Sequence, residues 1–231
     1  MSSSLDILIF GAHPDDAEIG MGGTIVKHTL AGYRVGICDL THAELSSNGT
    51  VETRKQEADA ASQILGIAIR SNLGLPDRGL FMCMEQINAI VLEIRKHQPR
   101  IVFAPYWQDR HPDHVMCSQL VQEAVFNAKL RRYIPQVEAV KVEQLFFYFV
   151  NDVYDADVMI DVTTSYESKS KALLAYKTQF FADEPDQVKT PINQGYLERV
   201  VARDRLLGQQ HSVDFAEGFV SKLPLLLNLF H

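Results

Sequence analysis

Short apolar runs alternate with longer amphipathic stretches along the first 130 residues, and this alternation constrains the fold more than any other feature. The apolar runs predict buried strands at residues 5–10, 33–40, 68–73 and 101–104. The stretches after them predict helices at residues 19–30, 52–65, 85–97 and 113–128. Strands joined by helices favour right-handed crossovers, so we expect an α/β fold: a Rossmann-like, mostly parallel sheet with helices on both faces.

The second half of the chain is less regular. Its pattern predicts strands at residues 144–150 and 157–162 and helices at residues 165–178 and 195–207. A polar, proline-containing segment at residues 182–193 separates these helices, and we expect a lid or a subunit contact there. Because no repeat or linker divides the sequence, we predict a single domain over residues 1–231, with a core at 1–130 and a C-terminal α+β extension at 131–231.

Composition narrows the class of protein. The chain has 22 Lys and Arg against 29 Asp and Glu, and its net charge of -7 disfavours non-specific binding to nucleic acid, which needs a basic surface. Hydrophobic residues at 46% and charged residues at 22% are typical of globular proteins. Cys38, Cys83 and Cys117 are widely spaced and form no CxxC pair, which predicts reduced thiols rather than disulfides or a thiolate zinc site.

The N-terminal segment and the apolar runs bear on location. The first residues lack the basic region and the small-residue cleavage site of a signal peptide. The longest apolar runs, such as residues 145–150 and 223–227, are far shorter than the ~20 residues that span a bilayer. We therefore expect a cytoplasmic protein that does not contact membranes.

Histidine and aspartate residues follow two of the predicted strands. Residues 11–16 read Gly-Ala-His-Pro-Asp-Asp directly after the first strand, and residues 109–114 read Asp-Arg-His-Pro-Asp-His shortly after the fourth. Ligands bind at the carboxyl ends of parallel strands, so we expect these side chains to lie together. Such a group suits a divalent ion held by two histidines and one carboxylate, with a position open for water. A plain helix N-cap is the alternative for Asp16 or Asp113.

Two other motifs favour structural interpretations. Gly20, Gly22 and Gly23 do not have the GxGxxG spacing, so we interpret them as sites of close helix packing rather than dinucleotide binding. The run Phe-Phe-Tyr-Phe at residues 146–149 has no interleaved basic residues and predicts core rather than a surface that stacks on bases. Both observations agree with a protein that does not bind nucleic acid.

The motifs at residues 12–16 and 111–114 resemble those of the LmbE-like (PIG-L) zinc-dependent N-deacetylases, and the resemblance covers most of the chain. Segments at 36–41, 45–50, 75–80 and 216–219 resemble the branch of that family that serves bacillithiol biosynthesis. The resemblance implies that the protein is a metal-dependent amidohydrolase that acts on a linear amide. The expected reaction is hydrolysis of the acetamide of N-acetyl-alpha-D-glucosaminyl L-malate to glucosaminyl-malate and acetate.

The resemblance also implies roles for particular residues. His13, Asp16 and His114 match the ligands of one Zn²⁺ per subunit, and Fe²⁺ suits the same ligands. Asp15 matches the general base, which takes a proton from water and returns it to the departing amine. His111 matches the residue that stabilises the oxyanion.

A helix N-terminus disfavours a protonated imidazole, so we expect a carboxylate partner for His111. Asp113 is the first candidate for that partner and Asp109 the second, the alternative for Asp113 being a simple helix cap. The mycothiol branch of the family has a tyrosine two residues before the histidine that corresponds to His111, and this sequence has Asp109 there.

Substrate contacts are expected around the same pocket. Arg54 and Asp77 match the residues with which the family holds the sugar hydroxyls. Ser47 lies in the loop before Arg54, and Arg78 lies in another loop at a strand end. The two carboxylates of malate need cations, for which the candidates are Arg110 and Lys189.

Two alternatives remain at this stage. The first is a broader deacetylase of N-acetylglucosamine or chito-oligosaccharides. The second is a non-catalytic sugar- or nucleotide-binding module with a structural metal, which three protein ligands and a spare Asp15 disfavour because structural zinc sites use four protein ligands. The expected partner is a small N-acetyl amino sugar. The resemblance further implies a homo-oligomer, with a hexamer as one option.

Overall fold

The computed structural model describes residues 4–181 and 187–226. Its first half alternates strands and helices as predicted. The elements are β1 (Ile7–Gly11), α1 (Asp16–Leu30), β2 (Val35–Thr41), α2 (Val51–Leu65), β3 (Ile69–Leu75), α3 (Met84–His97), β4 (Ile101–Pro105) and α4 (Pro112–Ala128). Strands β1 and β2 are buried along their whole length, as continuous apolar runs require. Helix α2 begins with a capping box between Thr50 and Thr53 and ends at Gly66, whose φ of 68° suits glycine.

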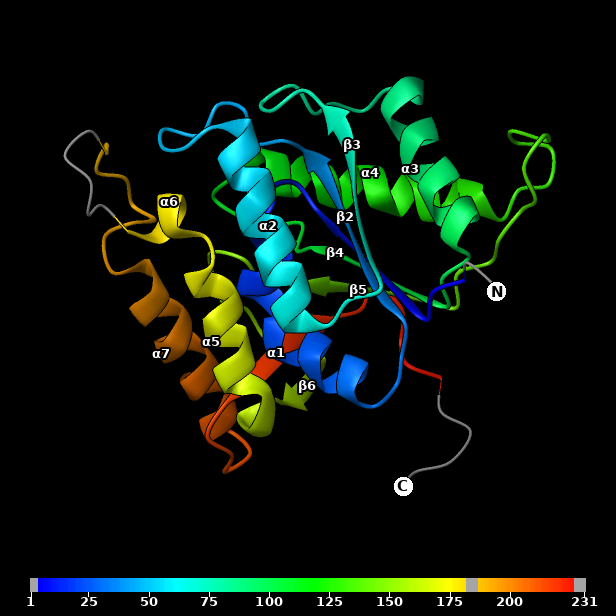
Figure 1. Cartoon of the computed structure of the whole chain (residues 1–231). Coiled ribbons are helices and arrows are strands. Elements are labelled where there is room, and N and C mark those ends of the chain that lie inside the picture. Colours follow the sequence, from blue (N-terminus) through cyan, green and yellow to red (C-terminus); the bar gives the residue numbers. More distant parts are fainter. Residues whose placement is uncertain (1–3, 182–186, 227–231) are drawn as a thin grey trace.

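A seven-stranded sheet runs through both halves of the chain (Figure 1). The second half adds β5 (Gln144–Tyr148), β6 (Val158–Asp161) and β7 (Ala216–Val220). The strand order is β3-β2-β1-β4-β5-β7-β6, and among the described strands only β7 runs opposite to all the others. The order therefore reverses between β1 and β4, which is the position where open α/β sheets bind ligands.

Helices cover both faces of the sheet, which confirms the predicted fold class. Helices α3 and α4, green in Figure 1, pack on one face with an apolar core of their own. The other face is covered by α1, α2 and three later helices: α5 (Tyr166–Leu174), α6 (Lys177–Phe180) and α7 (Tyr196–Gln209). The predicted core run at residues 146–149 is buried between these layers.

The second half departs from prediction in two places. The expected helix at residues 165–178 is interrupted, because the chain forms a 3₁₀ turn at Thr163–Ser165 and then two helices, α5 and α6. The break between α5 and α6 buries Tyr176, whose hydroxyl donates to Glu18 at 3.0 Å. Strand β7 was not predicted. Residues 182–186 of the expected loop lie outside the described residues, and the rest of that loop borders the pocket described below.

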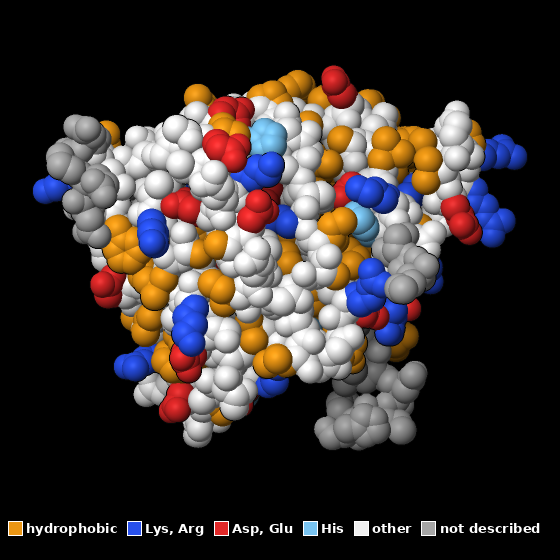
Figure 2. All heavy atoms as spheres, in the orientation of Figure 1, with side chains coloured by type: hydrophobic (Ala, Val, Ile, Leu, Met, Phe, Trp, Pro, Cys, Tyr) orange, Lys and Arg blue, Asp and Glu red, His pale blue; other side chains and the backbone are white. Residues whose placement is uncertain are grey.

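The surface is mixed in charge. On the face shown in Figure 2, blue and red side chains of the described residues are interspersed rather than gathered into a basic stripe. Within the described ranges, every helix is too short or too polar to cross a bilayer. The three cysteines are free thiols, and two of them, Cys38 and Cys117, are buried.

Candidate active site

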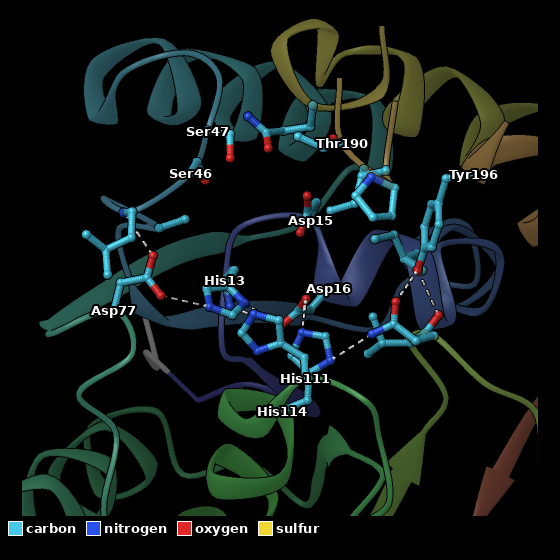
Figure 3. Close-up of a pocket in the computed structure, with 18 of the residues that line it drawn as sticks. His13, Asp15, Asp16, Ser46, Ser47, Asp77, His111, His114, Thr190 and Tyr196 are labelled. Carbon is cyan, nitrogen blue, oxygen red and sulfur yellow. Dashed lines mark hydrogen bonds and ion pairs between the residues drawn. The ribbon is translucent and has the colours of Figure 1, made fainter. Parts of the chain in front are cut away.

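The carboxyl ends of β1 and β4 hold the predicted chemistry. The turn after β1 carries His13, Asp15 and Asp16, and the segment after β4 carries His111 and His114. These side chains meet at the floor of a pocket of about 290 Å³ (Figure 3). The predicted residues that line this pocket are His13, Asp15, Asp16, Ser47, Arg54, Asp77, Arg78, Arg110, His111 and His114. Lys189 is exposed and does not line it, although the next residue, Thr190, does.

Asp16 lies between the other two predicted metal ligands, and each of its carboxylate oxygens faces one histidine. Nε2 of His114 is 3.1 Å from Oδ1 of Asp16, and Nδ1 of His13 is 3.7 Å from Oδ2 of Asp16. Ligand atoms that surround a zinc ion tetrahedrally with ~2.1 Å bonds are ~3.4 Å apart. His13 and His114 also form a possible ligand group with His111. The donor types and their spacing therefore fit a divalent metal ion.

A carboxylate lies on the outer edge of each histidine ligand. Nδ1 of His114 is 3.0 Å from Asp109, and Nε2 of His13 is 3.3 Å from Asp77 and 3.5 Å from Asp113. Such partners fix the orientation of a ligand ring and select the nitrogen that faces the metal. Asp77, predicted to bind sugar hydroxyls, thus contacts His13 through one oxygen, and its other oxygen accepts from the backbone of Leu45 at 3.0 Å.

Asp15 and Asp16 are adjacent in the chain, but their carboxylates occupy different places in the pocket (Figure 3). Asp15 has a φ of 119°, a left-handed backbone conformation that non-glycine residues rarely adopt. Its Oδ2 accepts from Nη1 of Arg54 at 2.7 Å. Burial raises the pKa of Asp15 to about 6, and the guanidinium of Arg54 limits this rise. The two adjacent carboxylates therefore have different partners, Asp15 facing Arg54 and Asp16 facing the histidines.

Arg54 lines the pocket but is a buried residue. Its side chain donates to Asp15, to the Pro14 carbonyl at 2.9 Å and to Oγ of Ser46 at 2.9 Å. Only 5% of the residue is exposed, and its Nε has no hydrogen-bond partner among the described residues. Its contacts are those of a residue that orients Asp15.

His111 differs from the expectation of a protonated ring with a carboxylate partner. It is the N-cap of α4, and its Nδ1 accepts from the backbone N–H of Asp113 at 3.2 Å. An acceptor Nδ1 leaves the proton of a neutral ring on Nε2. Burial and the two neighbouring histidines lower the pKa of His111 to about 4. The Asp113 carboxylate binds Arg78 at 2.8 Å and that of Asp109 faces His114, so neither forms an ion pair with His111 in the described chain.

The predicted metal ligands and the aspartates around them shift one another's pKa values when no metal is bound. Burial alone would lower the pKa of His13, but Asp113 and Asp77 raise it to about 10. Burial is likewise outweighed for His114, whose pKa Asp16 and Asp109 raise to about 9. Although burial opposes it, the facing His114 holds the pKa of Asp16 below its usual value. Two protonated rings therefore offset part of the negative charge of the surrounding aspartates when the site holds no metal.

Sequence reasoning missed two residues that complete the site. Asn151 follows β5 and donates to Asp109 at 2.8 Å. The hydroxyl of Tyr196, at the start of α7, donates to the Val150 carbonyl at 3.1 Å and lies 3.2 Å from Oδ1 of Asn151. Both line the pocket. Each is a single polar residue in the irregular half of the chain, and no local pattern distinguishes it.

A histidine- and carboxylate-lined pocket at the switch point of a mostly parallel sheet places the chain among α/β enzymes with a metal-ion site. Comparison with known families makes this specific. Residues 8–125, which contain β1 through most of α4, match the family described as PIG-L, GlcNAc-PI de-N-acetylase. The chain belongs to this family of de-N-acetylases, enzymes that hydrolyse an amide.

Relatives of the chain agree with this family. Diacetylchitobiose deacetylase of Thermococcus kodakarensis is 30% identical over 77% of this chain and 71% of the relative. A probable N-acetyl-alpha-D-glucosaminyl L-malate deacetylase 2 of Bacillus subtilis is 27% identical over 75% of this chain and 82% of the relative. The crystal structure of the conserved protein TT1542 from Thermus thermophilus is 40% identical, covers 96% of this chain and 97% of that one, and superposes with a TM-score of 0.89.

Proposed function

We propose that this protein is a zinc-dependent N-deacetylase of N-acetylglucosamine glycosides. The observation that carries the proposal is one pocket in which Asp16 faces both His13 and His114, beside a separate carboxylate, Asp15. Zinc suits a set of two histidines and one carboxylate, and Fe²⁺ is the alternative metal. When bound, the metal lowers the pKa of a water molecule and polarises the acyl oxygen of the amide.

Asp15 is the proposed proton carrier. One of its oxygens is held by Arg54, which leaves the other for a water molecule in the pocket. It accepts the proton of the attacking water and then delivers a proton to the nitrogen that leaves. An amide nitrogen is a poor leaving group without that proton.

His111 is the proposed donor to the oxyanion. Its Nδ1 is occupied by the Asp113 N–H, so Nε2–H is the free donor of a neutral ring. A neutral N–H donor in a partly buried pocket stabilises a developing negative charge without needing a carboxylate partner. This replaces the protonated histidine of the sequence-based hypothesis.

The proposed substrate is an N-acetylglucosaminyl group joined to malate. A pocket of about 290 Å³ is at the small end of ligand sites and suits one sugar ring, which puts the aglycone toward solvent. The exposed Arg110 borders the pocket and offers a cation to a malate carboxylate. The Bacillus subtilis relative supports this substrate. The Thermococcus kodakarensis relative supports the second candidate, a deacetylase of diacetylchitobiose.

Acetate release tests the proposal. The purified protein is incubated with N-acetylglucosaminyl malate, diacetylchitobiose and N-acetylglucosamine, each with added zinc and with a chelator. We expect zinc-dependent release of acetate, fastest from the malate glycoside. Faster release from diacetylchitobiose would favour the second candidate, and binding without release from any sugar would indicate a non-catalytic module.

A further inference from the structure

Helix α1 is broken in its first half. Met21 has φ −150° and ψ 24°, outside the helical range, so a first turn at residues 16–20 is separated from a longer segment. The break contains the glycines that sequence analysis assigned to close packing, and the structure confirms that role for Gly20. A Cβ atom there would lie 2.2 Å from the ring of Tyr148.

Two charged side chains bind the backbone groups at the break. In a continuous helix the Gly23 N–H would donate to the Ile19 carbonyl. Here the Gly23 N–H donates to Oε1 of Glu217 at 2.9 Å, and the Thr24 N–H donates to Oε2 at 2.6 Å. The Ile19 carbonyl accepts from Nη2 of Arg203 at 2.6 Å. A carboxylate at one helix end and a guanidinium at the other complement the helix dipoles, so the break is stabilised from both sides.

A buried network joins these two charges. Nζ of Lys169 lies 2.7 Å from Glu217 and 2.6 Å from Asp204, and Asp204 lies 2.9 Å from Nε of Arg203. Lys169 and Asp204 are completely buried. Well-packed apolar side chains often stabilise a core as well as buried ions do, so stability alone does not explain the network.

Arg203 also contacts the opposite side of the metal site. Its Nη1 donates to the carbonyls of residues 149–150 at 3.1 and 2.9 Å. The next residue, Asn151, donates to Asp109 at 2.8 Å, and Asp109 is the carboxylate that faces His114. A single guanidinium therefore connects the turn that begins at one candidate ligand with the segment that supports another.

We propose that Arg203 and Glu217 are positioning residues of the metal site, an inference that rests on the proposed function. Both lie outside the set of residues that line the pocket, so they act through other groups. Arg203 holds the end of the first turn of α1, which begins at Asp16, and Glu217 holds the start of the segment after the break. Arg203 in addition sets the distance between that turn and the segment that supports His114. Preorganised ligands bind a metal more tightly than loosely held ones.

Metal binding by Arg203→Met and Arg203→Lys tests the inference. Binding of Co²⁺ is followed by its visible absorption, and binding of Zn²⁺ by calorimetry, on the full-length protein stripped of metal. The matched control is Arg95→Met. Arg95 is also buried and donates to backbone carbonyls, among them that of Ala128 at 3.1 Å, but it lies in α3 on the other face of the sheet. Melting temperatures of the metal-free proteins measure the general loss of stability.

We expect Arg203→Met to bind both metals about 10- to 100-fold more weakly and to shift the Co²⁺ spectrum. Arg203→Lys keeps the charge but lacks the planar fork that reaches both backbone segments, so we expect an intermediate loss. Arg95→Met should lower the melting temperature and leave metal affinity within about twofold of wild type. Wild-type affinity and spectrum in the Arg203 variants would overturn the inference. If Arg203→Met does not fold, the result for Arg203→Lys by itself supports or overturns it. Failure of the wild type to bind either metal would instead contradict the proposed function.

Discussion

Asp109 lies 3.0 Å from Nδ1 of His114, on the edge of the imidazole ring opposite to the Nε2 atom that faces Asp16. This carboxylate is itself fixed, because it accepts from the backbone N–H of His111 at 2.7 Å and from the side chain of Asn151. Asp109 thus keeps the Nδ1 proton in place and leaves Nε2 for a metal.

Replacement of Asp109 should weaken the metal site. We expect Asp109→Ala to lower zinc affinity about 10- to 100-fold, because the His114 ring loses the partner that orients it. Competition with a chromophoric chelator measures this affinity. Asp59→Ala, a change of an exposed carboxylate on α2, serves as the control and should bind zinc normally. Equal zinc affinity in the two variants would contradict the role of Asp109.

Substitutions of Asp15 and His13 should have different effects on turnover and on metal binding. We expect Asp15→Asn to keep its zinc and to lose at least about 10²-fold in kcat, because the proton carrier is gone. His13→Ala should lose zinc as well as activity, since a ligand is removed. Metal content by atomic emission and acetate release are measured on the same preparations. The division of roles fails if both variants lose zinc to the same extent.

Removal of the His111 ring should affect the transition state alone. We expect His111→Ala to lower kcat about 10²- to 10³-fold, with zinc content retained and KM changed little. The Nε2–H of this neutral ring is the donor that we propose for the oxyanion. A large rise in KM with an unchanged kcat would show instead that His111 binds the ground-state substrate.

Metal uptake should release protons. Carboxylates outweigh the effect of burial and raise the pKa of His13 to about 10 and of His114 to about 9 in the metal-free protein. At pH 7 both rings are therefore protonated, and zinc must displace about two protons to bind. Calorimetry in two buffers of different ionisation enthalpy counts them. Zinc binding that releases no protons at pH 7 would contradict this assignment of charge.

The same shifts predict how the stability of the metal-free protein depends on pH. Histidines with raised pKa values stabilise the folded state fully below pH 6.5, the value in the unfolded chain, and this contribution is lost as the pH rises through about 9 and about 10. The melting temperature of the metal-free protein should fall over this range. The zinc-loaded protein should not show this fall, because its histidines carry no such protons.

Charge reversal at Arg110 and at Lys189 should have different effects on KM for the malate glycoside. We expect Arg110→Glu to raise KM for the malate glycoside far more than for N-acetylglucosamine, because a repulsive charge then borders the pocket. Lys189→Glu should leave both KM values unchanged, since Lys189 does not line the pocket. Equal effects of Arg110→Glu on the two substrates would remove this arginine from the malate site.

The metal site could be predicted because its residues follow strands directly. The apolar runs that form β1 and β4 are unmistakable, and the reversal of strand order brings their carboxyl ends together. His13 and His114 are far apart in the chain, yet they lie in one pocket for this reason. The predicted cluster of histidines and aspartates thus depended on topology that local sequence patterns determine, whereas the particular ligand set depended on the resemblance to the deacetylase family.

Other features depend on contacts between distant segments and have no local signal. Strand β7 reads Ala-Glu-Gly-Phe-Val, which shows neither alternation nor a continuous apolar run. Glu217 is only 1% exposed, and its buried carboxylate is compensated by an ion pair with Lys169 and by hydrogen bonds from backbone N–H groups of α1. The left-handed backbone of Asp15 and the partners of Asp113 are likewise set by packing. A pattern search along the sequence cannot detect such pairings.

The place of β7 in the sheet has a consequence for how the enzyme matures. It is the last of the described strands along the chain, yet it lies between β5 and β6 in the interior of the sheet. A ribosome releases the chain from its N-terminus, so every candidate ligand is synthesised well before Glu217. The proposed role of Glu217 therefore implies that a nascent chain has all the candidate ligands before it has the residue that caps the broken helix. On this proposal, the site is completed only after β7 has been synthesised.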